Sequence, residues 1–289
     1  MSWRDLYPFA SHFVRVHGQR MHYVDEGTGE PLLFVHGNPT WSFYWRNLIL
    51  GLRDRYRCVA VDHIGCGLSD KPQDYEYTLA RRIDDLVELI RHLDLRGATL
   101  VAHDWGGAIG LGAVERERDR FQRIMLFNTG AFPPPFVPWR IAACRMPLLG
   151  QIGMRGLNVF ARGALTMAVE KPERMTADVR AGLLAPYQNW NDRVAIDHFV
   201  KDIPFSPKHA TWQTLEQVEA GLDSLKGLPI QLIWGMRDWC FRPECLERFV
   251  RHWPQAEVQR FDDCGHYVVE DAHERIVPLM REFLTRNSA

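Results

Sequence analysis

The stretch at residues 101–110, Val-Ala-His-Asp-Trp-Gly-Gly-Ala-Ile-Gly, most constrains how this chain can fold. An apolar run at residues 98–102 leads into it and is typical of a strand buried on both faces of a parallel sheet. The small, apolar residues 108–114 follow and indicate a helix packed close against that sheet. Asp104 stands between them, with two glycines shortly behind it. The stretch therefore predicts a strand, a sharp turn that presents a carboxylate, and a helix.

This layout is that of a nucleophile elbow, whose usual signature is Gly-x-Ser-x-Gly. Here the signature is Ala102-His103-Asp104-Trp105-Gly106, so that Asp replaces Ser and Ala replaces the first Gly. The alternative is an ordinary turn in which Asp104 only caps the helix that follows. The rest of the chain decides between the two interpretations.

Composition excludes several classes of protein. The 289 residues carry a formal net charge of −1, which suggests neither a nucleic-acid partner nor an anionic membrane as partner. Six scattered cysteines without a Cys-x-x-Cys pair favour reduced thiols in a cytoplasm over disulfides or a zinc site. No signal peptide and no run of about 18 apolar residues is found, so we expect no membrane span.

Strands and helices alternate along the chain, which predicts a mostly parallel sheet covered by helices. The first two strands alternate apolar and polar residues and are expected to form an antiparallel hairpin at one edge. Helices are expected at residues 41–52, 78–93, 108–114, 243–253 and 274–286. The expected strands are residues 13–16, 19–24, 31–35, 56–61, 98–102, 124–128, 230–234 and 257–261.

The alternation breaks after Asn128, where a Phe-Pro-Pro-Pro run begins at Phe132. From there to about residue 221 the pattern is helical, with helices expected at 148–168, 177–185 and 192–199. We interpret residues 132–221 as a helical cap inserted into a core domain made of residues 1–131 and 222–289. The alternative is that this segment simply continues the core.

Four polar side chains follow four different predicted strands: Asn38, Asp104, Asp238 and His266. Ligands and catalytic groups in open α/β sheets gather at the carboxyl ends of the strands. Taken singly, His266 is one of twelve histidines, and Asp238 is a candidate cap for the helix near residue 243. Taken together, they predict a site with Asp104 as nucleophile, His266 as base and Asp238 as the acid that orients the imidazole.

Over nearly its full length the chain resembles an α/β-hydrolase of the haloalkane dehalogenase group. The resemblance implies the α/β-hydrolase fold, with a mostly parallel sheet flanked by helices and an inserted helical cap. Asn38, Trp105 and the position of the acid at Asp238 are similar to the third subfamily of that group. The matching segments are His36-Gly37-Asn38-Pro39, residues 62–69, residues 101–107 and Gly265-His266.

Other segments resemble the OleB-type β-lactone decarboxylases of long-chain olefin synthesis. These are residues 128–132, 202–207 and 234–241. The two groups are close relatives, and the motifs do not separate them.

The dehalogenase resemblance implies a two-step reaction, which we take as the leading expectation. Asp104 displaces a halide and becomes an alkyl ester, while Trp105 and the Asn38 side chain donate hydrogen bonds to the leaving halide. His266, oriented by Asp238, then activates water, and backbone N–H groups of Trp105 and Asn38 stabilise the oxyanion. The products are a primary alcohol and halide. We expect an apolar small-molecule substrate and no metal or organic cofactor, and a homo-oligomer is compatible with the sequence.

Several other functions compete. A β-lactone decarboxylase gives an alkene and carbon dioxide and still needs Asp104 and His266. An epoxide hydrolase relies on two cap tyrosines, whereas the proposed cap contains only Tyr187. A serine esterase lacks its serine here, and a fluoroacetate dehalogenase would have Arg in place of Trp105. A receptor or scaffold is expected to have lost the nucleophile, acid or base.

Overall fold

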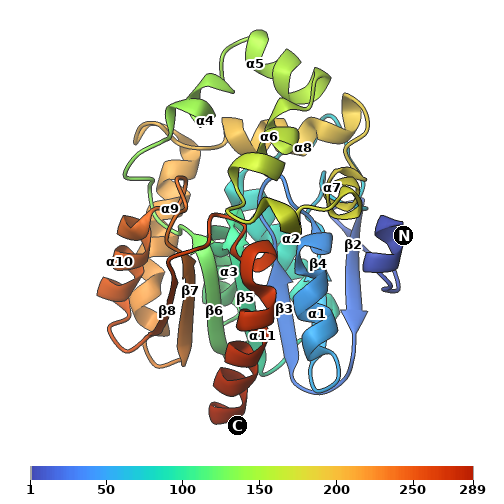
Figure 1. Ribbon diagram of the computed structural model, residues 1–289. Helices are drawn as coiled ribbons and strands as arrows, with labels where there is room; N and C mark the ends of the chain where they lie inside the picture. Colours follow the sequence, from blue (N-terminus) through green and yellow to red (C-terminus); the bar gives the residue numbers. More distant parts are fainter. Residues whose placement is uncertain (1, 289) are drawn as a thin grey trace.

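The computed structural model describes residues 2–288 and contains, within that range, one eight-stranded sheet in the order β1-β2-β4-β3-β5-β6-β7-β8. All neighbouring strands are parallel except β1–β2 and β2–β4. The predicted hairpin therefore forms one edge of the sheet (Figure 1). The strands are β1 His12–Val16, β2 Gln19–Glu26, β3 Pro31–Val35, β4 Arg57–Val61, β5 Ala98–Asp104, β6 Phe121–Thr129, β7 Ile230–Gly235 and β8 Glu257–Phe261.

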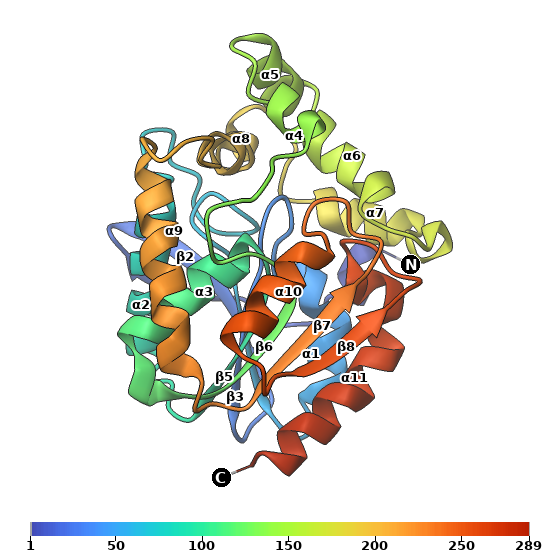
Figure 2. The same cartoon turned by 90° about the vertical axis from the view of Figure 1, so that its left-hand side faces the viewer.

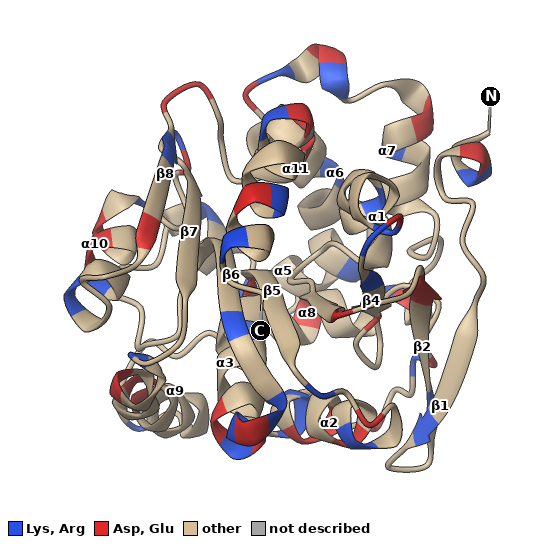
Figure 3. Cartoon of the chain, turned by 90° about the horizontal axis from the view of Figure 1, so that it is seen from below, with Lys and Arg blue, Asp and Glu red and all other residues tan. Residues whose placement is uncertain are grey.

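Helices cover both faces of the sheet (Figures 1 and 3). Three of them, α2 Leu79–His92, α3 Trp105–Arg116 and α9 Ala210–Gly221, pack together on one face. On the other face α1 Arg46–Leu52 packs against α11 Val268–Arg286. The central strands β3 and β5 are buried almost throughout, which explains their unbroken apolar sequences. The predicted fold class is confirmed.

Five short helices lie above the carboxyl ends of the strands and cover them (Figures 1 and 2). These five helices lie within residues 132–221, the segment predicted to be the cap. Helix α10, Pro243–His252, lies outside this layer beside β8. The covering helices are α4 Trp139–Ala143, α5 Leu149–Gln151, α6 Val159–Met167, α7 Ala177–Leu184 and α8 Val194–Lys201.

The prediction of a single helix at residues 148–168 is wrong. This segment is divided into α5, a π-helical turn at Ile152–Gly156, and α6. Asn158 has a left-handed backbone, with φ of +57°, and this conformation separates the two parts because it cannot continue a right-handed helix. Apolar periodicity alone does not reveal the break, because it carries no information on backbone handedness.

Two further boundaries differ from expectation. Helix α11 begins at Val268, earlier than residue 274, and is kinked at Ala272. Helix α9 lies within the segment expected to be cap, yet it packs against α3 and α2 on the sheet (Figure 2). We therefore propose that the cap ends near residue 209, ahead of α9.

None of the helices in residues 2–288 combines the length and apolar character that crossing a bilayer requires.

Candidate active site

Asp104 occupies a tight turn between β5 and α3. Its backbone has φ of +55° and ψ of −132°, a conformation that a side chain other than glycine rarely adopts. The Thr129 hydroxyl donates a hydrogen bond to the Asp104 carbonyl oxygen and holds the turn from the neighbouring strand. Strain of this kind is retained where the surrounding structure imposes it, which is common at functional sites.

Two glycines make this turn possible. A Cβ at Gly37 would lie 1.9 Å from the Asp104 Oδ1 atom, and a Cβ at Gly106 would lie 2.1 Å from the Val35 carbonyl oxygen. Neither distance is tolerable, so a side chain at either position would displace the turn. Gly37 thus allows the loop after β3 to lie directly against the carboxylate.

His266 lies between two carboxylates. Its Nδ1 atom is 2.8 Å from Oδ2 of Asp238, and its Nε2 atom is 3.6 Å from Oδ2 of Asp104. All three side chains are buried, and the Phe241 ring stacks on the imidazole at 5.7 Å between centroids. The structure thus brings together the predicted nucleophile, base and acid in the geometry of a catalytic triad.

The surroundings shift the pKa values of His266 and Asp104. Burial disfavours the charged imidazole, but the charge and hydrogen bond of Asp238 and the charge of Asp104 together raise the pKa of His266. Burial raises the pKa of Asp104, although His266 and the N–H groups of Trp105 and Asn38 oppose this shift. The site therefore favours a charged imidazole beside a carboxylate that is costly to ionise.

Asp238 is held by groups that the sequence did not mark. The Asn128 side chain donates to Oδ2 of Asp238 at 3.0 Å, and the Cys240 N–H donates to Oδ1 at 2.6 Å. Asn128 also bonds both the N–H and the carbonyl of Gly235. The sequence places Asn128 only at the end of a predicted strand, with no sign of this role.

Asn38 and Trp105 both border the carboxylate of Asp104. The Asn38 N–H donates to Oδ1 of Asp104 at 2.6 Å, as an oxyanion donor would. The Asn38 side-chain amide donates to the Ile196 carbonyl of the cap at 3.3 Å. Trp105 lines a cavity, and its indole N–H donates to no acceptor among residues 2–288. That N–H is available to a ligand.

Two cavities meet at the carboxylate of Asp104. Both are bordered by five residues: Asn38, Asp104, Ile141, Phe160 and Cys240. The first continues beneath the proline-rich segment, along Phe132, Pro135, Phe136, Val200, Ile203 and Leu215. The second continues between α4 and α6, along Trp139, Val159, Ala164, Met167, Trp239 and Tyr267.

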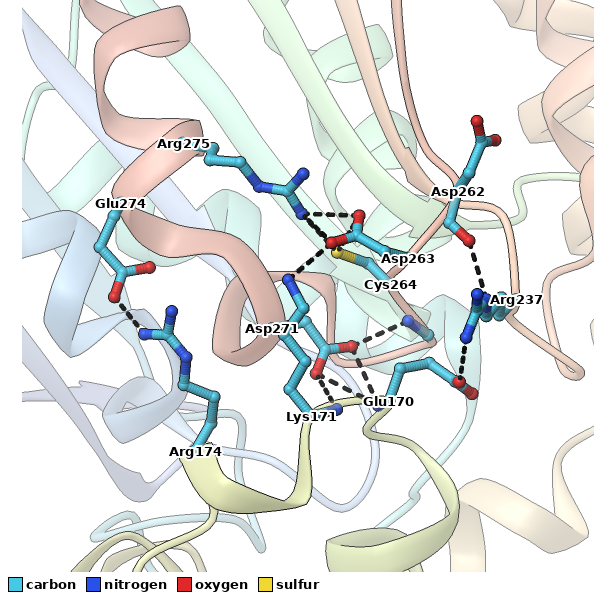
Figure 4. A network of polar contacts seen from close by, with 11 residues as sticks. Glu170, Lys171, Arg174, Arg237, Asp262, Asp263, Cys264, Asp271, Glu274 and Arg275 are labelled. Carbon is cyan, nitrogen blue, oxygen red and sulfur yellow. Dashed lines mark hydrogen bonds and ion pairs between the residues drawn. The ribbon is translucent and has the colours of Figure 1, made fainter.

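The cap is tied to the loop that carries His266 by a polar network shown in Figure 4. Asp271, which is fully buried, accepts hydrogen bonds from the N–H groups of Gly265 at 2.8 Å, Glu170 at 3.1 Å and Lys171 at 3.0 Å. Sequence reasoning missed Asp271, since no spacing or motif distinguishes it from a surface carboxylate. It joins the part of the cap just after α6 to the turn before His266.

The cap tyrosine named in the sequence analysis lies apart from the site. The Tyr187 hydroxyl is buried and donates to the Thr40 carbonyl at 3.2 Å, away from both cavities. It is therefore not placed to protonate an epoxide. Within residues 2–288, no three His, Cys, Asp or Glu side chains are grouped as metal ligands.

Comparison with known proteins places these features in a family. The profile of the alpha/beta hydrolase fold matches residues 30–272. A cis-3-alkyl-4-alkyloxetan-2-one decarboxylase of Xanthomonas campestris is 46% identical over 283 residues, covering 93% of this chain and 94% of the relative. The corresponding decarboxylase of Shewanella oneidensis is 42% identical, covering 97% of this chain and 90% of the relative.

Dehalogenases are also similar. Haloalkane dehalogenase 2 of Mycobacterium bovis is 33% identical and covers 96% of each chain. The crystal structure of the haloalkane dehalogenase DatA from Agrobacterium tumefaciens superposes with a TM-score of 0.88 at 28% identity, covering 96% of this chain and 97% of DatA.

Proposed function

The chain belongs to the α/β-hydrolase family, and we propose that it converts cis-3,4-dialkyl β-lactones to an alkene and carbon dioxide, with Asp104 as nucleophile. Relatives named for this substrate are 42–46% identical, whereas the dehalogenase relative is 33% identical. The comparisons therefore favour the function that sequence reasoning placed second, over the haloalkane dehalogenase it placed first.

The observation that carries this proposal is the pair of apolar cavities that meet at Asp104. A 3,4-dialkyl β-lactone has two alkyl chains on adjacent ring carbons, so the ring at Asp104 would direct one chain into each cavity. A primary haloalkane has one chain and needs one cavity. Burial of each methylene contributes about 0.8 kcal/mol, so two filled cavities favour the branched substrate.

The first step is opening of the lactone ring. A carboxylate oxygen of Asp104 attacks ring carbon 4 in line, the bond from that carbon to the ring oxygen breaks, and an alkyl ester forms. The electron pair of the broken bond remains on the oxygen, which becomes part of a free carboxylate. The raised pKa of His266 favours an imidazolium, which stabilises this new negative charge.

The second step regenerates the enzyme without water. The bond between the free carboxylate and carbon 3 breaks, and its electrons form the double bond between carbons 3 and 4. The ester bond to Asp104 breaks in the same event, returning the carboxylate and releasing carbon dioxide and the alkene. Inversion in the first step followed by anti elimination retains the cis arrangement of the alkyl groups.

The test is a side-by-side assay of one enzyme preparation. A cis-3,4-dialkyl β-lactone and a 1-bromoalkane of matched chain length are each supplied, and alkene, alcohol and bromide are quantified. We expect the cis alkene from the lactone, with a higher kcat/KM than bromide release. Bromide and alcohol without any alkene would refute the proposal. Asp104→Ala is the control for spontaneous lactone decomposition.

A haloalkane dehalogenase is the second candidate, and a specific observation supports it. Trp105 lines the cavity beside Asp104, and its N–H makes no hydrogen bond to a residue among 2–288, as expected of a halide donor. Hydrolysis of the alkyl ester would then need water activated by His266. A lactone substrate provides no halide, so the two functions make different demands on Trp105.

A further inference from the structure

Large hydrophobic side chains are exposed on one part of the cap. Among residues 2–288, eight of the thirteen exposed large hydrophobic residues fall within residues 139–167. Trp139 and Leu148 are each 74% exposed, and Leu149 and Leu157 are 67% and 65% exposed. The remaining four are Met146, Ile152, Val159 and Met167. We call the surface formed by these eight residues the cap face.

The charge of the same segment has one sign. Residues 132–169 contain four arginines and no Asp or Glu, although the whole chain is nearly neutral. Arg140 and Arg162 are exposed and form no ion pair with a residue among 2–288, whereas Arg145 is half-buried and Arg155 is buried. Asp202 and Asp197 lie near Arg145 and Arg155, so the exposed, unpaired positive charge of this segment is that of Arg140 and Arg162.

The cap face also surrounds an entrance to the candidate site. Helix α5 stands at the tip of the molecule, with α4 and α6 next to it (Figures 1 and 2). Trp139, Val159 and Met167 are exposed and at the same time line the second cavity, which leads to Asp104 and His266. Anything bound to the cap face therefore lies at the mouth of that cavity.

We propose that the cap face docks on the surface of an anionic lipid bilayer, with the mouth of the second cavity turned toward the lipid. Exposed aliphatic residues, a Trp and the two exposed arginines Arg140 and Arg162 are the composition of an interfacial membrane-binding surface. A symmetric contact between two copies would oppose the same arginine-bearing face to itself, so charge disfavours that occupant. Apolar substrates partition into bilayers, and docking would bring the cavity to them.

Vesicle flotation tests the proposal with the full chain. We expect the protein to float with vesicles of phosphatidylcholine containing 30% phosphatidylglycerol and to remain unbound with pure phosphatidylcholine. Leu149→Glu/Leu157→Glu should abolish flotation, whereas Leu50→Glu, at a residue 41% exposed on α1, should not change it. Arg162→Gln should lower the partition coefficient on anionic vesicles about fivefold, the effect of one charge near such a surface.

Two results would overturn the proposal. One is the absence of flotation with anionic vesicles at low salt. The other is a concentration-dependent dimer in analytical ultracentrifugation that Leu149→Glu/Leu157→Glu dissociates, without flotation of the parent, which would make the cap face a contact between copies. The double variant should keep the parent's rate on a short-chain, water-dispersed substrate, which separates loss of docking from loss of fold or of the candidate activity.

Discussion

The side chain of Asn128 donates a hydrogen bond to the carboxylate of Asp238, with 3.0 Å between Nδ2 and Oδ2. Asn128 is the residue before the last of β6, and Asp238 follows β7, its neighbour in the sheet. The same amide bonds both backbone groups of Gly235, so it fixes the loop and the acid together. The Asn128 amide cannot itself serve as the acid, but it holds the carboxylate of Asp238 in place. Asn128 is therefore a candidate positioning residue.

We predict that Asn128→Asp lowers kcat about tenfold or more while leaving the fold intact. A second carboxylate beside Asp238 replaces a donor with a like charge, so the two carboxyl groups must share a proton. The pH profile of kcat should shift, which a purely structural defect would not cause. Asn191→Asp, at an exposed position, is the matched control. An unchanged pH profile in Asn128→Asp would refute this role.

The sheet and the candidate site residues could be predicted because both depend on local sequence. Each central strand is a short apolar run that ends at a loop, and the carboxyl ends of parallel strands meet at one edge. Asn38, Asp104, Asp238 and His266 lie together for that reason. Their roles remain predictions, although their geometry fits them.

The cap could not be predicted to the same extent. The break at Asn158 depends on a left-handed residue, and sequence periodicity does not report backbone handedness. The placement of α9 on the sheet depends on packing against α3, a contact between distant segments. Asp271 functions through three backbone N–H groups from two loops, and no motif encodes such an arrangement.

Asp104→Asn should abolish turnover of both substrates and stabilise the fold at neutral pH. The folded-state pKa of Asp104 is raised, so the ionised carboxylate destabilises the fold above that pKa, and the cost disappears as pH falls through it. The neutral amide avoids this cost. We expect a Tm higher by about 2 °C or more at pH 7 and a smaller difference in acid.

Calorimetry at several pH values measures this difference, and intact-protein mass detects any deamidation that restores the acid. A Tm advantage that grew toward low pH would contradict the sign of the pKa shift. Turnover of either substrate by undeamidated Asp104→Asn would remove the nucleophile assignment.

Trp105→Phe should separate the two candidate functions. It keeps an aromatic ring beside Phe199 and in the lining of the cavity but removes the indole N–H. We expect bromide release from a bromoalkane to fall at least tenfold, about 1.4 kcal/mol of transition-state stabilisation. Alkene formation from a lactone should change much less, because no halide forms. Equal losses in both reactions would show that Trp105 acts through packing.

His266→Phe tests whether the imidazole acts before or after the covalent step. Halide leaves without a proton, so Asp104 can still be alkylated by a bromoalkane when the imidazole is absent. Hydrolysis of the ester then lacks its base, because His266 is the histidine whose Nε2 faces Asp104, at 3.6 Å. We predict a burst of about one bromide per site, followed by arrest. The mass of the protein should rise by the alkyl group less one proton, with the adduct on Asp104.

The same variant should behave differently with a β-lactone. The alkyl ester carries its own carboxylate and breaks down by loss of carbon dioxide, so no water and no base are needed. We therefore expect slow, continuing alkene formation without a stable adduct, the loss in rate reflecting the missing imidazolium. His92→Phe, at an exposed position, should retain the parent's rate with both substrates. A stable lactone adduct on Asp104 would show that His266 acts in the breakdown of the ester, and steady bromide release without an adduct would place the base elsewhere.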